Sequence, residues 1–326
     1  MGAFDEAGYA PIRPLLEDGT VSEIMINGLG AVFVERDGRL EYSDCRITSD
    51  RELNFLVETI LRPTGRRLDA ERPYVDGRLP DGSRVNVVAS PLAVDGTSVT
   101  IRKMARGLAN LGDLVANGTL SRGMAKFLQD AIVERKNLVF SGGTGSGKTT
   151  LLGLLSQAID ERERLVVIED TTELSFSQPN VVRLEARRSN VEGSGEVTSE
   201  DLLRNALRMR PSRVIMGELR GPDAYEFLQA LATGHDGGLA VLHAGTSQGA
   251  ISRLLSLASA SRVQLPLWAL KEIIGRELDY VVQVARLTSG QRVVSQISGV
   301  FECSENGFRI EDRFRFDAES GKFLEH

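Results

Sequence analysis

The chain has 326 residues, and at roughly 100–200 residues per domain this length predicts two or three domains. Hydrophobic residues make up 41% and charged residues 26%, a globular mixture that excludes an intrinsically disordered chain. The formal net charge of −6 argues against a dedicated duplex-DNA-binding protein, because such proteins are usually basic, although it does not exclude a local basic groove.

Targeting and redox signals point to the cytoplasm. Cys45 and Cys303 are the only two cysteines, so no disulfide framework is implied and a reducing compartment fits. No apolar run approaches the roughly 18 residues that a membrane helix needs. The N-terminal residues lack the basic and apolar regions of a secretory signal. We therefore expect a cytoplasmic protein that is not embedded in a membrane.

Short strand patterns and one helical pattern predict a small α+β domain over residues 1–103. A helix is expected to begin at Ser49 or Asp50, since both are good caps and the following apolar residues recur on one helical face. Turn residues at 79–82 and 94–96 separate alternating apolar segments that are typical of strands. The expected strands cover residues 22–27, 31–35, 84–88 and 98–102.

A second domain is expected over residues 119–323. The residues before it, 104–118, contain glycine and asparagine and show little hydrophobic periodicity, so we interpret them as a linker. A helix beginning near Ser121 opens this domain. Apolar strands then alternate with helices, which indicates an α/β fold with a largely parallel sheet covered on both faces. Residues 324–326 resemble the remnant of a purification tag. The expected strands cover residues 137–140, 165–168, 181–184, 214–216 and 239–242.

A phosphate-binding loop is the strongest motif. Residues 142–149 read G-G-T-G-S-G-K-T, which matches G-x-x-x-x-G-K-[ST] between an apolar strand and a helix. Glycines let backbone N–H groups approach phosphate oxygens, and the helix N-terminus adds a favourable dipole. We expect Lys148 to bridge the β- and γ-phosphates and Thr149 to ligate Mg²⁺. The predicted nucleotide-binding residues are Gly142, Gly143, Thr144, Gly145, Ser146, Gly147, Lys148, Thr149 and Thr150.

Acidic residues follow two of the predicted strands. Glu169 and Glu173 come at or after the strand at 165–168, and Glu218 follows the strand at 214–216. The carboxyl ends of neighbouring parallel strands meet where ligands bind. Phosphoryl transfer to water needs one acid near Mg²⁺ and another that orients the water. These acids are therefore the candidate catalytic and metal-binding carboxylates.

The second acidic site departs from the usual Walker B pattern, because Gly217 stands where an aspartate commonly precedes the glutamate. The metal and water roles must then be shared between Glu218 and the 169–173 segment. We assign Glu173 to the attacking water and Glu218 to the metal shell, with Glu169 as a further Mg²⁺ ligand. The reverse assignment of Glu173 and Glu218 stays open.

Two of the three histidines, His235 and His243, lie in the segment 233–245. Two histidines eight residues apart, with no cysteine nearby, are a poor zinc site, since structural zinc takes four ligands. His243 ends a predicted strand at the same sheet edge as Glu218, where a histidine can sense a γ-phosphate. The alternative for each histidine is a purely structural role.

These motifs, in this order, resemble the ATPases of type II and type IV secretion systems, and most of all those of the CpaF/TadA type from tight-adherence (Flp) pilus machines. The family's marks are a Walker A loop at 142–149, an acidic "Asp box" at 167–174, the Walker B pair at 217–218 and a histidine box at 233–245. Segments 22–28, 79–86 and 204–211 also resemble the family, so that the resemblance covers about residues 12–303.

The resemblance implies a homohexameric ATPase with a RecA-like P-loop domain and a smaller, PAS-like α+β N-terminal domain. Its cofactors would be ATP and Mg²⁺, and its partner a polytopic platform protein of the inner membrane. The chain would lie at the cytoplasmic face of that membrane, without stable nucleic acid. The family's site receives arginines across an interface, and the candidates here are Arg84, Arg102, Arg204, Arg208 and Arg210, although each alone is equally compatible with a surface ion pair.

The resulting hypothesis is an ATP-hydrolysing motor for pilus assembly or type II-like secretion. A conjugation or type IV secretion ATPase of the VirB11/TrbB type is the alternative within the same fold. A nucleotide-switched binding module with little hydrolysis is a rival from another class, against which the presence of both Glu173 and Glu218 argues. A small-molecule kinase is disfavoured, because no acceptor-binding segment stands out.

Overall fold

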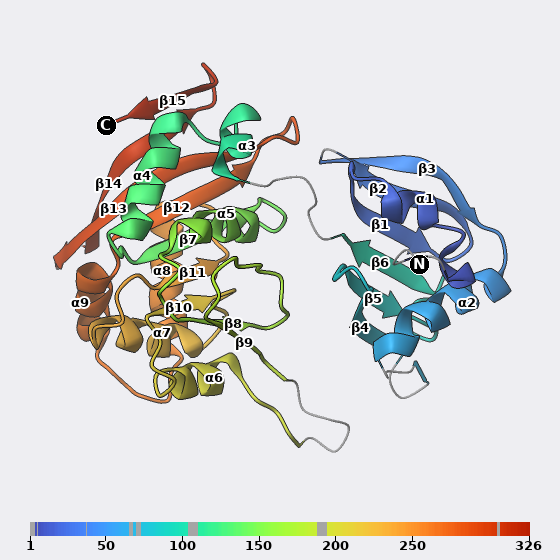
Figure 1. The fold of residues 1–326 in the computed structure, drawn as a ribbon, viewed down its shortest axis with the longest axis horizontal. Coiled ribbons are helices and arrows are strands. Elements are labelled where there is room, and N and C mark those ends of the chain that lie inside the picture. Colours follow the sequence, from blue (N-terminus) through green and yellow to red (C-terminus); the bar gives the residue numbers. More distant parts are fainter. Residues whose placement is uncertain are drawn as a thin grey trace. The chain divides into compact units, whose positions relative to one another are not determined.

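The structure is a computed structural model that describes residues 4, 6–36, 38–64, 68–69, 73–103, 110–187, 194–304 and 307–326. The chain divides into two compact units, one formed by the first 108 residues and one by nearly all of the rest (Figure 1). Each unit has its own sheet and its own hydrophobic core.

The first unit is a six-stranded antiparallel sheet with a helix on one face. Every second side chain of β5 and β6 is buried, and these side chains pack in one core with the apolar face of α2. Ser49 is the cap of α2, because its side chain accepts a hydrogen bond from the Glu52 amide. In sheet order the strands are β3 (Arg39–Ile47), β2 (Gly30–Arg36), β1 (Val21–Asn27), β6 (Ser98–Arg102), β5 (Arg84–Val88) and β4 (Tyr74–Arg78); the helices are α1 (Arg13–Glu17) and α2 (Asp50–Leu61), with 3-10 turns at Ala7–Tyr9 and Arg62–Thr64.

Two of these strands, β3 and β4, lie outside the predicted ones. Both are edge strands, and β3 exposes most of its residues. A strand with solvent on both faces does not show the apolar alternation by which strands are identified in a sequence.

The second unit contains a nine-stranded sheet, with parallel strands on one side and antiparallel strands on the other. The α/β fold with a largely parallel part is therefore confirmed. β12 pairs in parallel with β7 and antiparallel with β13, so that it joins the two parts. In sheet order the strands are β15 (Lys322–Glu325), β14 (Gly307–Asp317), β13 (Arg292–Ser304), β12 (Tyr280–Arg286), β7 (Leu138–Gly142), β11 (Leu239–Leu242), β10 (Arg213–Met216), β8 (Leu165–Glu169) and β9 (Val181–Glu185).

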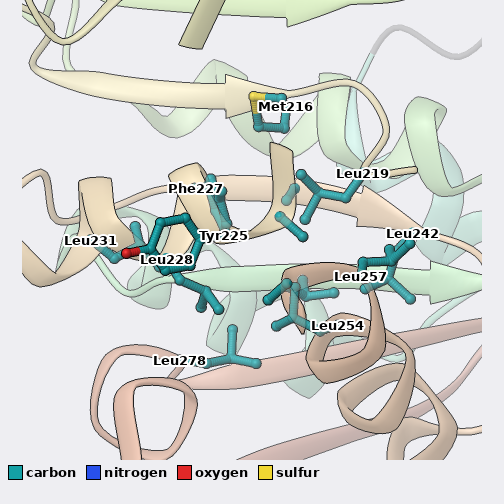
Figure 2. Packing of buried hydrophobic residues seen from close by; sticks show 14 of the residues in the cluster. Met216, Leu219, Tyr225, Phe227, Leu228, Leu231, Leu242, Leu254, Leu257 and Leu278 are labelled. Carbon is teal, nitrogen blue, oxygen red and sulfur yellow. The ribbon is translucent and has the colours of Figure 1, made fainter. Parts of the chain in front are cut away.

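Helices cover both faces of the parallel part. Val139 of β7 belongs to a core that includes residues of α6, α7, α8 and α9 (Figure 2). Its neighbours Leu138 and Phe140 are also buried and point to the opposite face, on which α5 packs against β7. The helices of this unit are α3 (Leu111–Ala116), α4 (Arg122–Val133), α5 (Lys148–Leu155), α6 (Ser199–Ala206), α7 (Asp223–Ala232), α8 (Ser247–Ser259) and α9 (Leu267–Glu277), with a 3-10 turn at Ser156–Ala158.

The predicted linker needs correction, and the residues expected to be a tag remnant extend the sheet. Residues 104–109 lie outside the described part of the chain, but 111–116 form α3 rather than a linker. Asn110 and the N3 residue Asp113 form a reciprocal capping box at its start, and two leucines of this helix are buried. Leu324 and Glu325 belong to β15, where they pair with β14. Among the described helices, none is both long and apolar enough to cross a membrane.

Candidate functional site

The glycine-rich loop connects β7 to α5 at the carboxyl end of the sheet. A Cβ on Gly142 would lie 2.2 Å from the carbonyl oxygen of Val284 on the neighbouring strand β12, so only glycine fits there. Gly147 caps α5 with φ +100°, a conformation that other residues rarely adopt. The loop therefore has the backbone geometry that leaves the amides at the start of α5 available to an anion.

Lys148 holds the loop in shape from within. Its side chain is buried, and Nζ donates hydrogen bonds to the carbonyl oxygens of Gly142 (3.0 Å) and Gly143 (2.6 Å). Ser146 Oγ donates to the same Gly143 carbonyl at 2.9 Å. Thr149 and Thr150 follow in the first turn of α5 and are half-buried. The ammonium thus lies inside the cradle, where a polyphosphate would meet it.

Two arginines that sequence reasoning missed lie beside this loop. Arg292 at the start of β13 donates from Nε to the Gly145 carbonyl at 3.1 Å. Arg286 at the end of β12 approaches Gly145, since its guanidinium would be 4.0 Å from a Cβ built there. Neither residue belongs to a recognisable motif. They lie near the loop because β12 and β13 are antiparallel neighbours, so that the end of β12 and the start of β13 are adjacent. Both add positive charge next to the predicted phosphate site.

Glu218 and His243 meet at the same end of the sheet. Parallel register aligns Met216 of β10 with Ile168 of β8, and Glu218 follows β10 directly. His243 Nε2 lies 3.2 Å from Glu218 Oε1, and Arg220 donates to Glu218 Oε2 at 2.7 Å. The structure therefore brings together two residues that the sequence placed 25 positions apart, and it adds Arg220, which the sequence reasoning missed.

Arg220 also connects the two acidic segments. Its Nε lies 3.3 Å from Asp170 Oδ2, while the other end of the guanidinium binds Glu218. The signal available in the sequence was its position, two residues after the Walker B glutamate. This arrangement fixes the loop after β8 relative to the loop after β10.

The charges around Glu218 and His243 set their protonation. Burial alone would raise the pKa of Glu218, but the hydrogen bond and charge of Arg220, with the charges of His243 and Lys148, bring it below its ordinary value. Burial and then the charge of Lys148 lower the pKa of His243, although Glu218 opposes this. Near pH 7 we therefore expect an ionised Glu218 and a neutral His243 that can donate one N–H to it.

Glu169, a predicted Mg²⁺ ligand, is bound by the backbone of its own loop. Its side chain is only 4% exposed, and Oε1 accepts hydrogen bonds from the backbone amides of Glu173 (2.8 Å) and Leu174 (3.1 Å). Burial raises the pKa of this carboxyl, against the effect of those two amides. One oxygen is thus already engaged by the backbone, which weakens the prediction that Glu169 ligates Mg²⁺.

Two other predicted Mg²⁺ ligands, Thr149 and Glu218, are of the types that bind this ion in nucleotide sites. Magnesium is commonly held by one or two carboxylates together with phosphates and waters. Over the described residues, no cluster of three or more His, Cys, Asp or Glu side chains could hold a metal by itself. The Thr149 hydroxyl and the Glu218 carboxylate stay the predicted Mg²⁺ ligands beside a bound nucleotide. His243 and Arg220 occupy the two Glu218 oxygens, so Mg²⁺ would have to replace at least one of these partners.

His235, Arg204 and Arg208 lie outside this cluster within the unit, and their predicted contacts with a nucleotide stay predictions. His235 precedes β11 and so lies at its amino end, whereas His243 follows the carboxyl end; its Nδ1 is 3.2 Å from the Ala230 carbonyl. Arg204 of α6 is paired with Glu200 and with Glu226 of α7. Arg208 donates to the Arg204 carbonyl at 2.7 Å. Local hydrogen bonds and ion pairs thus occupy these side chains.

Arg84 and Arg102 belong to the first unit. They face each other across the antiparallel strands β5 and β6, and Arg102 Nε lies 3.8 Å from Glu23 Oε1. Their predicted contact with the nucleotide stays a prediction.

The sequence is similar to a known protein family and to several characterised relatives. The family described as "Type II/IV secretion system protein" matches residues 5–310. Conjugal transfer protein TrbB of Rhizobium radiobacter is 35% identical over 281 residues, covering 85% of this chain and 83% of the relative. Type IV secretion system protein VirB11 of Brucella suis is 34% identical over 301 residues, covering 84% and 83%.

A solved structure shows the same fold. The ATPase DotB of Yersinia pseudotuberculosis superposes with a TM-score of 0.65 at 17% identity, covering 92% of this chain and 81% of that one. The family match spans both units and includes the P-loop, Glu218 and His243. The chain therefore belongs to the type II/IV secretion system protein family.

Proposed function

We propose that the protein is an ATP-hydrolysing motor of a secretion or pilus machine. One observation carries this proposal: Lys148, Glu218 and His243 converge at the carboxyl end of the parallel sheet, around a loop built to receive phosphates. An ionised carboxylate beside a buried ammonium is the charge arrangement that phosphoryl transfer requires. Membership of a secretion family supports the same activity.

Each residue has a role that follows from its position. Lys148 can exchange its loop carbonyls for phosphate oxygens and offset their charge. Glu218 and Thr149 would hold Mg²⁺, which when bound neutralises charge on the phosphates. His243 orients Glu218 through its hydrogen bond. Glu173 would orient the attacking water and accept its proton, while the water oxygen bonds to the γ-phosphorus and the bond from this phosphorus to the bridging oxygen breaks, so that ADP leaves.

The finer assignment concerns the assembly and its partner. We infer a homohexamer that acts at the cytoplasmic face of the inner membrane on a polytopic platform protein of a tight-adherence pilus. ATP binding would close the two units on each other, with arginines such as Arg84 or Arg102 reaching the phosphates, and hydrolysis would release them. Resemblance of the motifs and of the segments 22–28, 79–86 and 204–211 supports this branch.

A second candidate is a conjugation or type IV secretion motor. The names of the relatives favour it, since TrbB is a conjugal transfer protein and VirB11 a type IV secretion protein. The identity of the neighbouring genes distinguishes the two candidate functions. Pilin and platform genes would support the pilus motor, whereas relaxase and coupling-protein genes would support conjugation and overturn the pilus branch.

Phosphate release by the purified protein tests the central proposal. We expect Mg²⁺-dependent ATP hydrolysis that falls at least about 100-fold in Lys148→Ala and in Glu218→Gln. Lys126→Ala is the matched control, because Lys126 forms an exposed ion pair with Asp130 on α4, away from the loop. Unchanged hydrolysis in the Lys148 variant would refute the proposal, and ATP that stays bound without phosphate release would indicate a nucleotide-switched module instead.

A further inference from the structure

We propose that Glu169 is a positioning residue for Glu173, and that glycine at position 217 exists to make room for it. The inference rests on the proposed function, because it takes Glu173 as the carboxylate that orients water. It reassigns Glu169 from magnesium binding to the shaping of the acidic loop.

The first observation is the double hydrogen bond. Glu169 Oε1 accepts from two consecutive amides, those of Glu173 and Leu174, at 2.8 and 3.1 Å. The two amides belong to the peptide planes on either side of the Glu173 Cα, so the two bonds restrain the orientation of both planes. Because the amide of Glu173 is bonded to its Cα, the same contact restricts the direction in which the Glu173 side chain leaves the backbone.

The rest of this loop is held from other sides. Thr172 donates from its amide and its hydroxyl to Glu185 Oε2 at 2.9 and 2.8 Å. Arg183 binds the Leu174 carbonyl. The Leu174 side chain is buried and lies over Gly153 of α5. Glu169 is therefore the contact within this network that acts directly on the amide of Glu173.

The second observation is the space that Glu169 occupies. A Cβ on Gly217 would lie 2.6 Å from Glu169 Cγ and 3.3 Å from its Cβ. The register of β8 and β10 places these residues side by side, since Ile168 pairs with Met216. An aspartate at 217, as in the common Walker B pattern, would collide with this buried side chain. The departure from that pattern therefore has a steric cause in the neighbouring strand.

Exposure argues against magnesium binding by Glu169 in this geometry. Glu169 is a buried residue, only 4% exposed, whereas Glu218 is partly exposed. Its Oε1 would have to give up both amide bonds to reach a hydrated ion, which leaves only Oε2 of this enclosed carboxylate for such a contact. Its geometry thus suits a carboxylate that shapes the loop.

The first test compares Glu169→Ala with Glu169→Gln in the full-length protein. We expect the alanine variant to lose about 10- to 100-fold in kcat with ATP affinity nearly unchanged, because Glu173 is misplaced. The glutamine variant keeps a carbonyl oxygen for both amides and should restore most of kcat. Its half-saturating Mg²⁺ concentration should match wild type; an increase of about 10-fold or more would mark Glu169 as a metal ligand and overturn the proposal.

A readout independent of catalysis is amide hydrogen exchange in the peptide around residues 170–176. Exchange should accelerate in Glu169→Ala and stay near the wild-type rate in Glu169→Gln. Equal exchange in all three proteins would refute the positioning role. If the wild-type protein does not hydrolyse ATP, the proposed function fails, yet this measurement still decides whether Glu169 holds the loop.

The second test uses Gly217→Ala. The added Cβ should displace Glu169 and lower kcat about tenfold, but it should have no further effect when Glu169→Ala is already present. Gly19→Ala is the matched control, since a Cβ there meets nothing within 4 Å. Additive losses in the double variant would show that Gly217 is needed for a reason other than Glu169.

Discussion

At both ends of the parallel strands in the nine-stranded sheet, one side-chain oxygen accepts hydrogen bonds from two consecutive backbone amides. At the amino end, Asn137 Oδ1 accepts from the consecutive amides of Gly237 and Gly238 at 2.8 and 2.9 Å. At the carboxyl end, Glu169 Oε1 accepts from the amides of Glu173 and Leu174. A neutral amide holds one turn and a carboxylate the other, and the second turn carries a candidate catalytic residue.

Charge by itself does not distinguish the functional end. The amino end has a closed network in which Arg213, 1% exposed, donates to both oxygens of Glu163 at 2.8 and 2.9 Å. Arg135 binds the same carboxylate and the Ser212 carbonyl. At the carboxyl end, Lys148 is held by carbonyls of its own loop, partners that a phosphate can replace. Lys148 therefore differs from Arg213 in that a bound phosphate can replace its present partners.

The largest expected effect concerns the amino end. Arg213→Ala should lower the free energy of unfolding by about 3–5 kcal/mol, because it breaks a buried ion pair. Burial would raise the pKa of Glu163, but Arg213 and Arg135 bring it below its ordinary 4.5, so their contribution is present at neutral pH and lost as acid protonates Glu163.

Denaturant unfolding at pH 7 and in the acid range measures both parts of this prediction. Lys126→Ala, in an exposed ion pair, should change the unfolding free energy by less than about 1 kcal/mol. Hydrolysis per folded molecule should persist in Arg213→Ala. A large loss of activity without loss of stability would place the amino end in the catalytic machinery and break the comparison.

An effect of intermediate size, on kcat, is expected from the two histidines that flank β11. His243→Ala should lower kcat about 10- to 100-fold, because Glu218 loses the hydrogen bond that orients it. His235→Ala should keep hydrolysis within about threefold, since its ring contacts only its own turn among the contacts described. Steady-state kinetics of both variants decide this, and equal losses would show that His235 also serves the site.

The smallest effect is expected in the first unit, where the buried Tyr9 hydroxyl has no hydrogen-bond partner among the described residues. Tyr9→Phe should change stability at pH 7 by less than about 1 kcal/mol. Burial, followed by the charge of Glu6, raises the pKa of Tyr9 from 10.0 to about 12. Between these values the folded chain keeps a proton that the unfolded chain has lost, so wild-type stability declines as pH rises.

Unfolding of wild type and Tyr9→Phe at pH 8 and pH 11 isolates this term, because all other groups are shared. We expect the variant to be relatively more stable at the higher pH. The same difference at both pH values would show that Tyr9 does not titrate with folding, and a loss of several kcal/mol at pH 7 would reveal a partner for its hydroxyl, as in the closed network of Arg213.

Much of this molecule could be predicted from local sequence patterns. The P-loop, the strand that precedes it and the helix that follows it are encoded within about two dozen consecutive residues, because glycine conformation and apolar periodicity act over short distances. Buried strands such as β8 and β10 are short apolar runs, and the acidic residues after them marked the carboxyl end of the sheet.

Other features depended on contacts that no local pattern contains. The pairing of the antiparallel strands β12 to β15 and the approach of Arg286 and Arg292 to the loop follow from how distant segments meet. The sequence by itself determined the nucleotide-binding loop and the family, since both rest on residue types at fixed spacing. Only the tertiary structure decided which amides Glu169 binds and why position 217 has room only for glycine, because these contacts arise where residues 48 positions apart in β8 and β10 lie in register.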